Sequence, residues 1–427
     1  MREPVVSRNF NVPNAWKIDV AESRGAYEYA RKALTMGTGV EVAEKVHTAG
    51  LRGCGGAGFP TAKKWSFLPK DSKKPIYLVV NADEGEPGTC KDRYILERDP
   101  HALVEGIILA CYAIKSHKAY VYIRGEYVIQ AQHFQSAVDE AYAKGYLGAK
   151  AFGADYRVDI TVHRGAGAYI CGEETALLNS LEGKRGLPRL KPPFPAIVGL
   201  FGCPTIINNV ETLASVMHIH RIGPEAFAAW GGPAAPPHLY SISGHVEKPG
   251  VYELPMTTTL REMIYDIGGG VRGGRTLKAV IPGGMSAKIL TPAEIDVKMD
   301  FDSLKAAGTM LGSGGVMVMD DTTCMVKALL YACKFFAHES CGQCSPCREG
   351  TGWALKIVER IYRGEGRLSD IDTLLDVAGR MEGRTICVFA DAAAWPIQSY
   401  IGKFRSEFED YIKSGKSAGR ELAGAAH

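Results

Sequence analysis

The chain has 427 residues, enough for two to four domains, and its 46% hydrophobic and 23% charged residues are typical of a globular protein. Its 50 basic and 47 acidic side chains nearly cancel, so the charge gives no argument for a nucleic-acid partner or an anionic membrane surface. No apolar run approaches the roughly 18 residues of a membrane span, and residues 1–20 lack the pattern of a signal or transit peptide.

Strands and helices alternate over the first half of the chain. We expect helices and short buried strands in turn, the helices over 21–50, 101–114 and 128–145 and the strands over 76–80, 119–125 and 158–165. This alternation predicts a mostly parallel, three-layer α/β domain over residues 1–230. Ligands bind such sheets at the carboxyl ends of the strands, where the loops NADEGEP (81–87) and HRGAGAYICGEE (163–174) lie.

The pattern changes after a Gly- and Pro-rich linker around residues 231–237. Residues 238–320 read as strand, strand, helix, strand, strand, an order that resembles a β-grasp domain. From 321 to 427, four stretches with apolar residues three and four positions apart predict a four-helix bundle. A cysteine motif opens the loop between the first two of these helices.

The cysteine motif has the spacing of an iron–sulfur site. Cys341, Cys344 and Cys347 form a C-x-x-C-x-x-C run, which places three soft thiolates around one turn, close enough to hold three corners of an iron–sulfur cube. The alternative is structural zinc, but zinc motifs usually bring two separated pairs of ligands. The spacing therefore favours the cluster.

The fourth cluster ligand must come from elsewhere in the chain. Cys324 and Cys333 fall in an apolar helical stretch, where a thiol is more often a small buried hydrophobe. Cys387 ends a short apolar segment just before another predicted helix. We therefore expect Cys387 to be the fourth ligand.

The loop GLRGCGGAGFPTAKKW (50–65) satisfies G-x-G-x-x-G. A Rossmann fingerprint follows a strand, whereas a helix-like segment precedes this loop. Its glycines let backbone amides approach a large flat or phosphorylated ligand. Lys63 and Lys64 would supply charge for a phosphate, and Phe59, Trp65 and Phe67 could stack on a ring. The alternative is a flexible surface loop with a solvated lysine pair.

Carboxylates follow two of the predicted strands: Asp83, Glu84, Glu86, Glu173 and Glu174. Carboxylates repel phosphate but accept hydrogen bonds from the hydroxyl groups of ribityl or ribose chains. The alternative for the last two is a helix N-terminus, where negative charge is favourable. Asn208 and Asn209 in PTIINNVETLAS either cap a helix or hydrogen-bond a ligand.

Five motifs in order carry a resemblance that runs almost end to end: GLRGCGGAGFPTAKKW, NADEGEPGTCKDRYIL, GAGAYICGEETALLNSLEG, PTIINNVETL and ESCGQCSPCREGT. The chain resembles the NADH-binding flavoprotein subunit of respiratory complex I. The resemblance implies FMN and NADH on a Rossmann-like α/β domain, then a β-grasp domain, then a helical bundle with one [4Fe-4S] cluster. It implies that the cluster is bound by Cys341, Cys344, Cys347 and Cys387.

The resemblance also implies the residues of the nucleotide sites. The FMN contacts would be Gly53, Gly55, Gly56, Lys64, Asn81, Asp83, Gly172, Glu173, Asn208, Asn209 and Thr212. The NADH site would be lined by Phe59, Phe67, Glu84, Glu86, Glu174 and Phe194. Members of the family commonly have Arg where this chain has Cys54 and Gly where it has Ala62. The Arg that Cys54 replaces would be a cation beside the nucleotide, so we expect its loss to affect nucleotide affinity or the preference between NADH and NADPH, without a change of fold.

The expected activity is the oxidation of NADH, with hydride transfer to FMN and single-electron transfer to the cluster. No side chain need act as an acid or a nucleophile, and Glu86 would modulate how tightly NAD binds. The implied partners are a thioredoxin-like [2Fe-2S] subunit and a large iron–sulfur subunit, on the cytoplasmic face of a membrane. One alternative is the NAD-reactive flavin subunit of a soluble hydrogenase or formate dehydrogenase; another is a zinc-stabilised binding module without redox activity.

Overall fold

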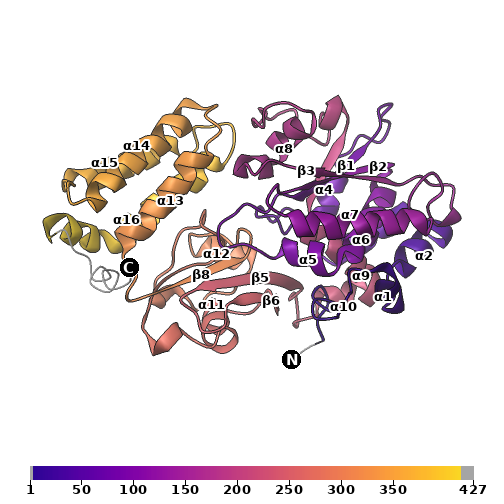
Figure 1. Ribbon diagram of the computed structural model, residues 1–427, viewed down its shortest axis with the longest axis horizontal. Helices are drawn as coiled ribbons and strands as arrows, with labels where there is room; N and C mark the ends of the chain where they lie inside the picture. Colours follow the sequence, from indigo (N-terminus) through magenta and orange to yellow (C-terminus); the bar gives the residue numbers. More distant parts are fainter. Residues whose placement is uncertain (1–2, 415–427) are drawn as a thin grey trace. The chain divides into compact units, whose positions relative to one another are not determined.

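The computed structural model describes residues 3–414 (Figure 1). The chain forms two compact units. The first comprises Met1–Gly85, Cys90–Tyr240 and Val251–Thr257, and the second comprises Glu86–Thr89, Ser241–Gly250 and Thr258–His427. The boundaries 1–230, 238–320 and 321–427 for three domains stay a prediction.

A parallel four-stranded sheet forms the centre of the first unit. Its strands are β1 (Tyr77–Ala82), β2 (Lys118–Ile123), β3 (Asp159–Arg164) and β4 (Thr205–Asn209), in the order β3-β2-β1-β4. All three strand pairs are parallel, which confirms the predicted α/β class. Leu78, Val79 and Val80 of β1 are fully buried, as expected for a parallel strand covered on both faces.

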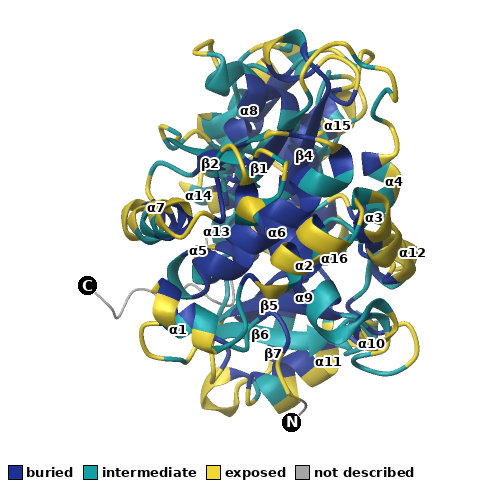
Figure 2. Ribbon diagram, turned by 90° about the vertical axis from the view of Figure 1, so that its right-hand side faces the viewer, coloured by how far each residue is buried: buried dark blue, intermediate teal, exposed yellow. Residues whose placement is uncertain are grey.

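Ten helices of the first unit are described: α1 (Ile18–Ser23), α2 (Glu28–Met36), α3 (Gly39–Thr48), α4 (Thr61–Trp65), α5 (Asp92–Arg98), α6 (Pro100–Ile114), α7 (Val128–Ala143), α8 (Glu174–Leu181), α9 (Val210–Ile222) and α10 (Pro224–Ala228). The helical stretch predicted at 21–50 is broken before α3, because Thr38 and Glu41 form a capping box that begins a new helix there. Figure 2 shows α6 as a buried helix. It packs so closely on α9 that a Cβ at Gly106 would lie 2.0 Å from the Leu213 carbonyl oxygen.

A second sheet has the order β6-β5-β8-β7. Its strands are β5 (Pro237–Gly244), β6 (Gly250–Pro255), β7 (Leu277–Ile281) and β8 (Gly315–Asp320). β5 and β8 are parallel and β7 and β8 antiparallel, and the short helices α11 (Leu260–Glu262) and α12 (Phe301–Ala306) lie between strands in the sequence. The predicted strand–strand–helix–strand–strand order is found with one difference, since α12 lies between β7 and β8.

The C-terminal part of the second unit is helical, with α13 (Met325–Glu339), α14 (Ser345–Tyr362), α15 (Ser369–Met381) and α16 (Phe389–Ser414). Each helix packs against its neighbour in the sequence, and α13 also packs against α16. Cys324 and Cys333 are buried, as the apolar stretch predicts. Within residues 3–414, none of the helices is both long and apolar enough to span a membrane.

Candidate functional site

The glycine loop (residues 53–58) lies between α3 and α4 and is held by its own hydrogen bonds. The Gly53 N–H donates to the Phe59 carbonyl oxygen at 2.9 Å, and Arg52 Nε donates to the Gly58 carbonyl oxygen at 2.6 Å. Gly56 and Gly58 have φ angles of 128° and 61°, which side chains rarely permit. A Cβ at Gly56 would meet nothing within 4 Å. The loop is therefore ordered and leaves room for a ligand beside its backbone.

The glycine loop approaches the start of α9. A Cβ at Gly55 would lie 3.2 Å from the Asn209 Cβ, and the Cys54 N–H donates to Thr212 Oγ1 at 2.9 Å. Asn209 Oδ1 accepts the N–H groups of Glu211 at 2.9 Å and Thr212 at 3.4 Å. The capping alternative is thus confirmed for Asn209, and the same residue lies directly beside the glycine loop.

The carboxyl ends of β1 and β4 bring two further predicted site residues together. Asn81 and Asn209 are register partners across the parallel pair. Asn81 Nδ2 donates to the Gly172 carbonyl oxygen at 2.8 Å, and its Oδ1 accepts the Asp83 N–H at 3.1 Å. A Cβ at Gly172 would lie 3.3 Å from the Asp83 carbonyl oxygen. Three loops that are distant in the sequence therefore meet at this edge of the sheet, as expected for a ligand site in a parallel sheet.

Helix α4 positions the aromatic and basic residues that follow the glycine loop. Trp65 is buried in the core and its Nε1 donates to Asn208 Oδ1 at 2.9 Å, so the expectation that its ring stacks on a ligand is wrong. Phe59 and Phe67 flank α4 with ring centroids 5.8 Å apart and are 42% and 48% exposed. Phe194 is exposed as well. Large exposed rings of this kind are suited to stacking on a base.

The two carboxylates at the start of α8 have different roles. Glu173 Oε2 accepts the N–H groups of Thr175 at 2.8 Å and Ala176 at 3.0 Å, so it is the N-cap of α8. The helix-N-terminus alternative is therefore confirmed for this residue. Glu174 is paired with Lys64 at 3.2 Å and Lys191 at 2.8 Å. Burial raises the pKa of Glu174, but the two ammonium groups outweigh it and hold the pKa below its ordinary value.

Glu84 and Glu86, two of the predicted site residues, accept hydrogen bonds from other residues of the chain. Glu84 is buried. Its carboxylate accepts a hydrogen bond from the Asp92 N–H at 2.8 Å and another from the Tyr127 hydroxyl at 2.8 Å. Burial and the neighbouring Asp92 carboxylate raise its pKa to about 7. Glu86 belongs to the second unit, where its oxygens accept the N–H and the hydroxyl of Ser286 at 2.8 and 2.9 Å. Their roles toward NADH stay predictions.

Lys91 and Asp92, which the sequence did not single out, support the edge of the sheet. Asn209 Nδ2 donates to Asp92 Oδ2 at 2.5 Å, and Lys91 Nζ donates to Asp92 Oδ1 at 2.8 Å. Lys91 is 1% exposed and also pairs with Glu211 Oε2 at 2.7 Å. The sequence feature that could have identified them is the Lys-Asp pair in the motif NADEGEPGTCKDRYIL, at the start of the short helix α5.

The cysteine motif lies between α13 and α14. Cys341 follows the end of α13, Cys344 is the N-cap residue of α14, and Cys347 lies in its first turn. Ser340 Oγ lies 3.3 Å from Cys347 Sγ. Burial raises the pKa of Cys347, the Ser340 hydrogen bond lowers it, and the nearby Cys341 and Cys344 raise it further. Cys387 lies just before α16, which begins at Phe389.

The donor sets fit the two expected cofactors. Four cysteine thiols near helix ends, none of them in a disulfide, are the ligands that a [4Fe-4S] cluster requires. The glycine loop, with open space at Gly56 and a close approach of Gly55 to Asn209, has the form of a backbone cradle for a flat, phosphorylated group.

Comparison with known proteins agrees with this geometry. Residues 46–218 match the Nuo51 FMN-binding domain, residues 238–318 the SLBB domain, and residues 327–411 the NADH-ubiquinone oxidoreductase-F iron-sulfur binding region. The chain is 53% identical over 414 residues to the second F-type subunit of the NADH-quinone oxidoreductase of Rhizobium meliloti (strain 1021), covering 97% of this chain and 98% of that protein. This chain belongs to the family of F-type subunits of NADH-quinone oxidoreductase. The corresponding F-type subunit of Rickettsia felis (strain ATCC VR-1525 / URRWXCal2) is 52% identical, with 97% and 99% coverage.

The fold also occurs in a solved hydrogenase. The chain superposes on a chain of an NAD+-reducing [NiFe]-hydrogenase in the H2-reduced state with a TM-score of 0.81 and 38% identity. The match covers 91% of this chain but only 66% of the hydrogenase chain. The hydrogenase chain therefore has the same fold over about two thirds of its length, and its remaining third has no counterpart in the match.

Proposed function

We propose that this chain is the electron-input subunit of an NADH:quinone oxidoreductase. It is an NADH dehydrogenase with FMN and a [4Fe-4S] cluster as cofactors. FMN accepts a hydride from NADH, and the cluster takes electrons one at a time. The observation that carries this function is the near-full-length identity to F-type subunits of NADH-quinone oxidoreductase.

The flavin would be held mainly by backbone. Gly53, Gly55 and Gly56 leave the amide groups of the loop accessible, and Asn81 and Asn209 fix the facing strand ends by their own hydrogen bonds. Lys64, Asp83, Gly172, Glu173, Asn208 and Thr212 complete the proposed FMN site. Rigid positioning of this kind is the protein's contribution, because the cofactor carries the chemistry.

NADH would bind through exposed rings and a shared charge pair. Phe59, Phe67 and Phe194 offer apolar faces for the adenine. Glu174 would line the same site, and it is paired at 3.2 Å with Lys64, one of the proposed FMN contacts. Lys64 would therefore reach the FMN phosphate only while this pair is loosened. We propose that Glu84 orders the neighbouring loop and that Glu86 modulates the affinity for NAD. Unchanged NADH and NAD affinities in Glu86→Gln would remove the second role.

The iron–sulfur cluster would be bound by Cys341, Cys344, Cys347 and Cys387. Three of these residues lie around the start of α14, and the fourth precedes α16. We propose that α13, α14, α15 and α16 act as a four-helix bundle that holds these two loops at the spacing the cluster needs.

We propose a peripheral position on the cytoplasmic face of a membrane complex, with a thioredoxin-like [2Fe-2S] subunit and a large iron–sulfur subunit as neighbours. The likeness to the hydrogenase chain supports a second candidate, the NAD-reactive flavin subunit of a soluble hydrogenase. Subunits that co-purify with the tagged chain from its own cells distinguish the two, since a nickel–iron subunit would indicate the hydrogenase.

The visible spectrum and electron paramagnetic resonance of anaerobically purified chain test the function. Flavin bands and broad iron–sulfur absorption that bleach on addition of NADH are expected, together with a paramagnetic signal from the reduced cluster. A colourless protein that contains zinc in place of iron would support the binding-module alternative and overturn the proposal.

A further inference from the structure

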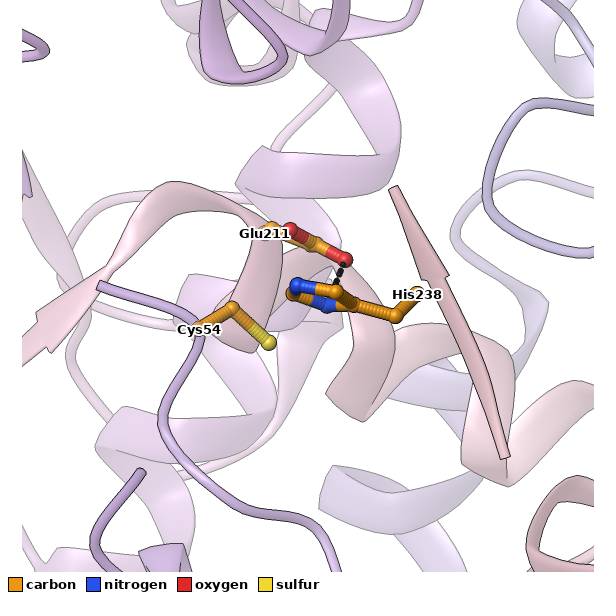
Figure 3. Close-up of side chains that lie close together, drawn as sticks. All are labelled: Cys54, Glu211 and His238. Carbon is orange, nitrogen blue, oxygen red and sulfur yellow. Dashed lines mark ion pairs between the residues drawn. The ribbon is translucent and has the colours of Figure 1, made fainter. Parts of the chain in front are cut away.

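Three buried side chains beside the glycine loop converge on one point (Figure 3). Cys54 comes from the glycine loop, Glu211 from the first turn of α9 and His238 from β5. One ligand atom from each lies within 4.8 Å of the other two, and the residues are 5%, 0% and 2% exposed. A thiol, an imidazole and a carboxylate in this arrangement form a potential metal site that is separate from the cluster cysteines.

The imidazole of His238 faces the carboxylate of Glu211 through its Nδ1. Its Nδ1 lies 2.9 Å from Glu211 Oε1, and the same oxygen accepts the Leu239 N–H at 2.9 Å. Its Nε2 is buried and has no hydrogen-bond partner among the residues that the structure describes. An ion shared with Glu211 Oε1 would take the place of the proton between this oxygen and Nδ1, so Nδ1 is the nitrogen that would bind it and Nε2 would carry the ring proton.

The charge balance also favours a cation. Lys91 is paired with both Asp92 at 2.8 Å and Glu211 at 2.7 Å, so one ammonium group faces two buried carboxylates. With the neutral imidazole that metal binding requires at His238, one negative charge remains in excess. A divalent ion that displaces the Cys54 thiol proton adds two positive charges and one thiolate, which makes the group neutral.

We propose that Cys54, His238 and Glu211 bind a zinc ion. A thiolate and an imidazole are soft to intermediate ligands that select zinc over calcium or magnesium, and a carboxylate is a common further ligand. Binding releases the thiol proton to solvent and involves no oxidation or reduction. The ion would join the glycine loop to α9 and to β5, and it would thereby hold Gly55 against Asn209 at the edge of the flavin cradle.

Metal analysis of the full-length chain tests this site. In anaerobically purified protein, inductively coupled plasma mass spectrometry is expected to find about one zinc ion per chain in addition to iron. Cys54→Ser and His238→Gln should lower the zinc content about tenfold or more and leave the iron unchanged. Cys111→Ala, which removes a buried thiol of α6, is the matched control and should keep the zinc.

A crystal of the wild-type chain measured at the zinc absorption edge gives a test that does not depend on folding of the variants. An anomalous difference peak among Cys54, Glu211 and His238 is expected. Zinc-free wild-type protein, zinc retained in Cys54→Ser, or a peak only at Cys341–Cys347 would each overturn the proposal. Flavin and iron contents of the same sample report on the proposed enzyme function separately.

Discussion

Asn209 Nδ2 donates to Asp92 Oδ2 at 2.5 Å while Asn209 Oδ1 caps α9. Asn209, at the end of β4, therefore connects the start of α9 to the start of α5, and it lies directly beside the glycine loop. Both of its polar atoms are used within the protein. In the proposed FMN site, Asn209 would therefore act by fixing the position of the glycine loop.

Asn209→Ala is expected to lower the free energy of unfolding by about 1–2 kcal/mol, because it removes a helix cap and one partner of Asp92. It should also lower the FMN content of the purified chain. Urea denaturation and flavin absorbance measure the two effects. Thr38→Ala is the matched control, since it removes the cap of α3 and should cost similar stability with full FMN content. Equal loss of FMN in both variants would contradict the positioning role.

The pKa of Glu84 is raised from its ordinary value of 4.5 to about 7 in the folded protein. We therefore expect the free energy of unfolding to fall as the pH rises through this interval. Between these values the folded protein binds the proton and the unfolded chain has lost it, so the stability that is fully present below pH 4.5 is lost as the pH rises through about 7.

The difference between wild type and Glu84→Gln isolates this contribution from other buried acids. In urea unfolding, the free energy of unfolding should decline between pH 4.5 and 8. The decline should be smaller in the variant than in wild type by on the order of 2 kcal/mol. Glu44→Gln changes an exposed carboxylate and should follow the wild-type profile. Parallel profiles for wild type and Glu84→Gln would show that Glu84 titrates normally.

Cys387→Ser is expected to lower the iron content from roughly four atoms per chain and to remove the paramagnetic signal of the NADH-reduced protein. The flavin content should be kept, since the glycine cradle is built from other residues. Cys333→Ala removes a buried thiol from α13 and should keep both iron and signal. A full complement of iron in Cys387→Ser would exclude Cys387 as a ligand.

Lys64→Gln is expected to raise the KM for NADH about three- to tenfold, which corresponds to ~1 kcal/mol, because Glu174 of the proposed NADH site loses a neutralising partner. The free energy of unfolding should change little. The pair with Glu174 is partly exposed, and such pairs contribute about 1 kcal/mol or less to folding. Steady-state kinetics and urea denaturation check the two statements. Lys184→Gln removes another lysine–glutamate pair near α8 and should leave KM unchanged. An equal rise in both variants would indicate a general charge effect.

Local patterns predicted most elements of this chain. Apolar residues at helical spacing gave α6, α7 and the four C-terminal helices, and short β-branched runs gave β1, β2 and β3 within a few residues. β4 was missed, because only Thr205, Ile206 and Ile207 precede two asparagines and so short a run has no periodicity of its own. Its pairing with β1 places Asn81 beside Asn209, a contact between distant segments that no local pattern contains.

The sequence by itself determined the family, the cysteine spacing that suits an iron–sulfur cluster and the alternation of strands and helices, because these depend on neighbours within one or two turns of chain. Only the tertiary structure decided that Glu173 caps α8, that Glu84 is buried with a raised pKa, and that Cys54, Glu211 and His238 meet. These properties arise from burial and from contacts between distant segments. Burial and long-range pairing exist only once the sheet has brought the strand ends together.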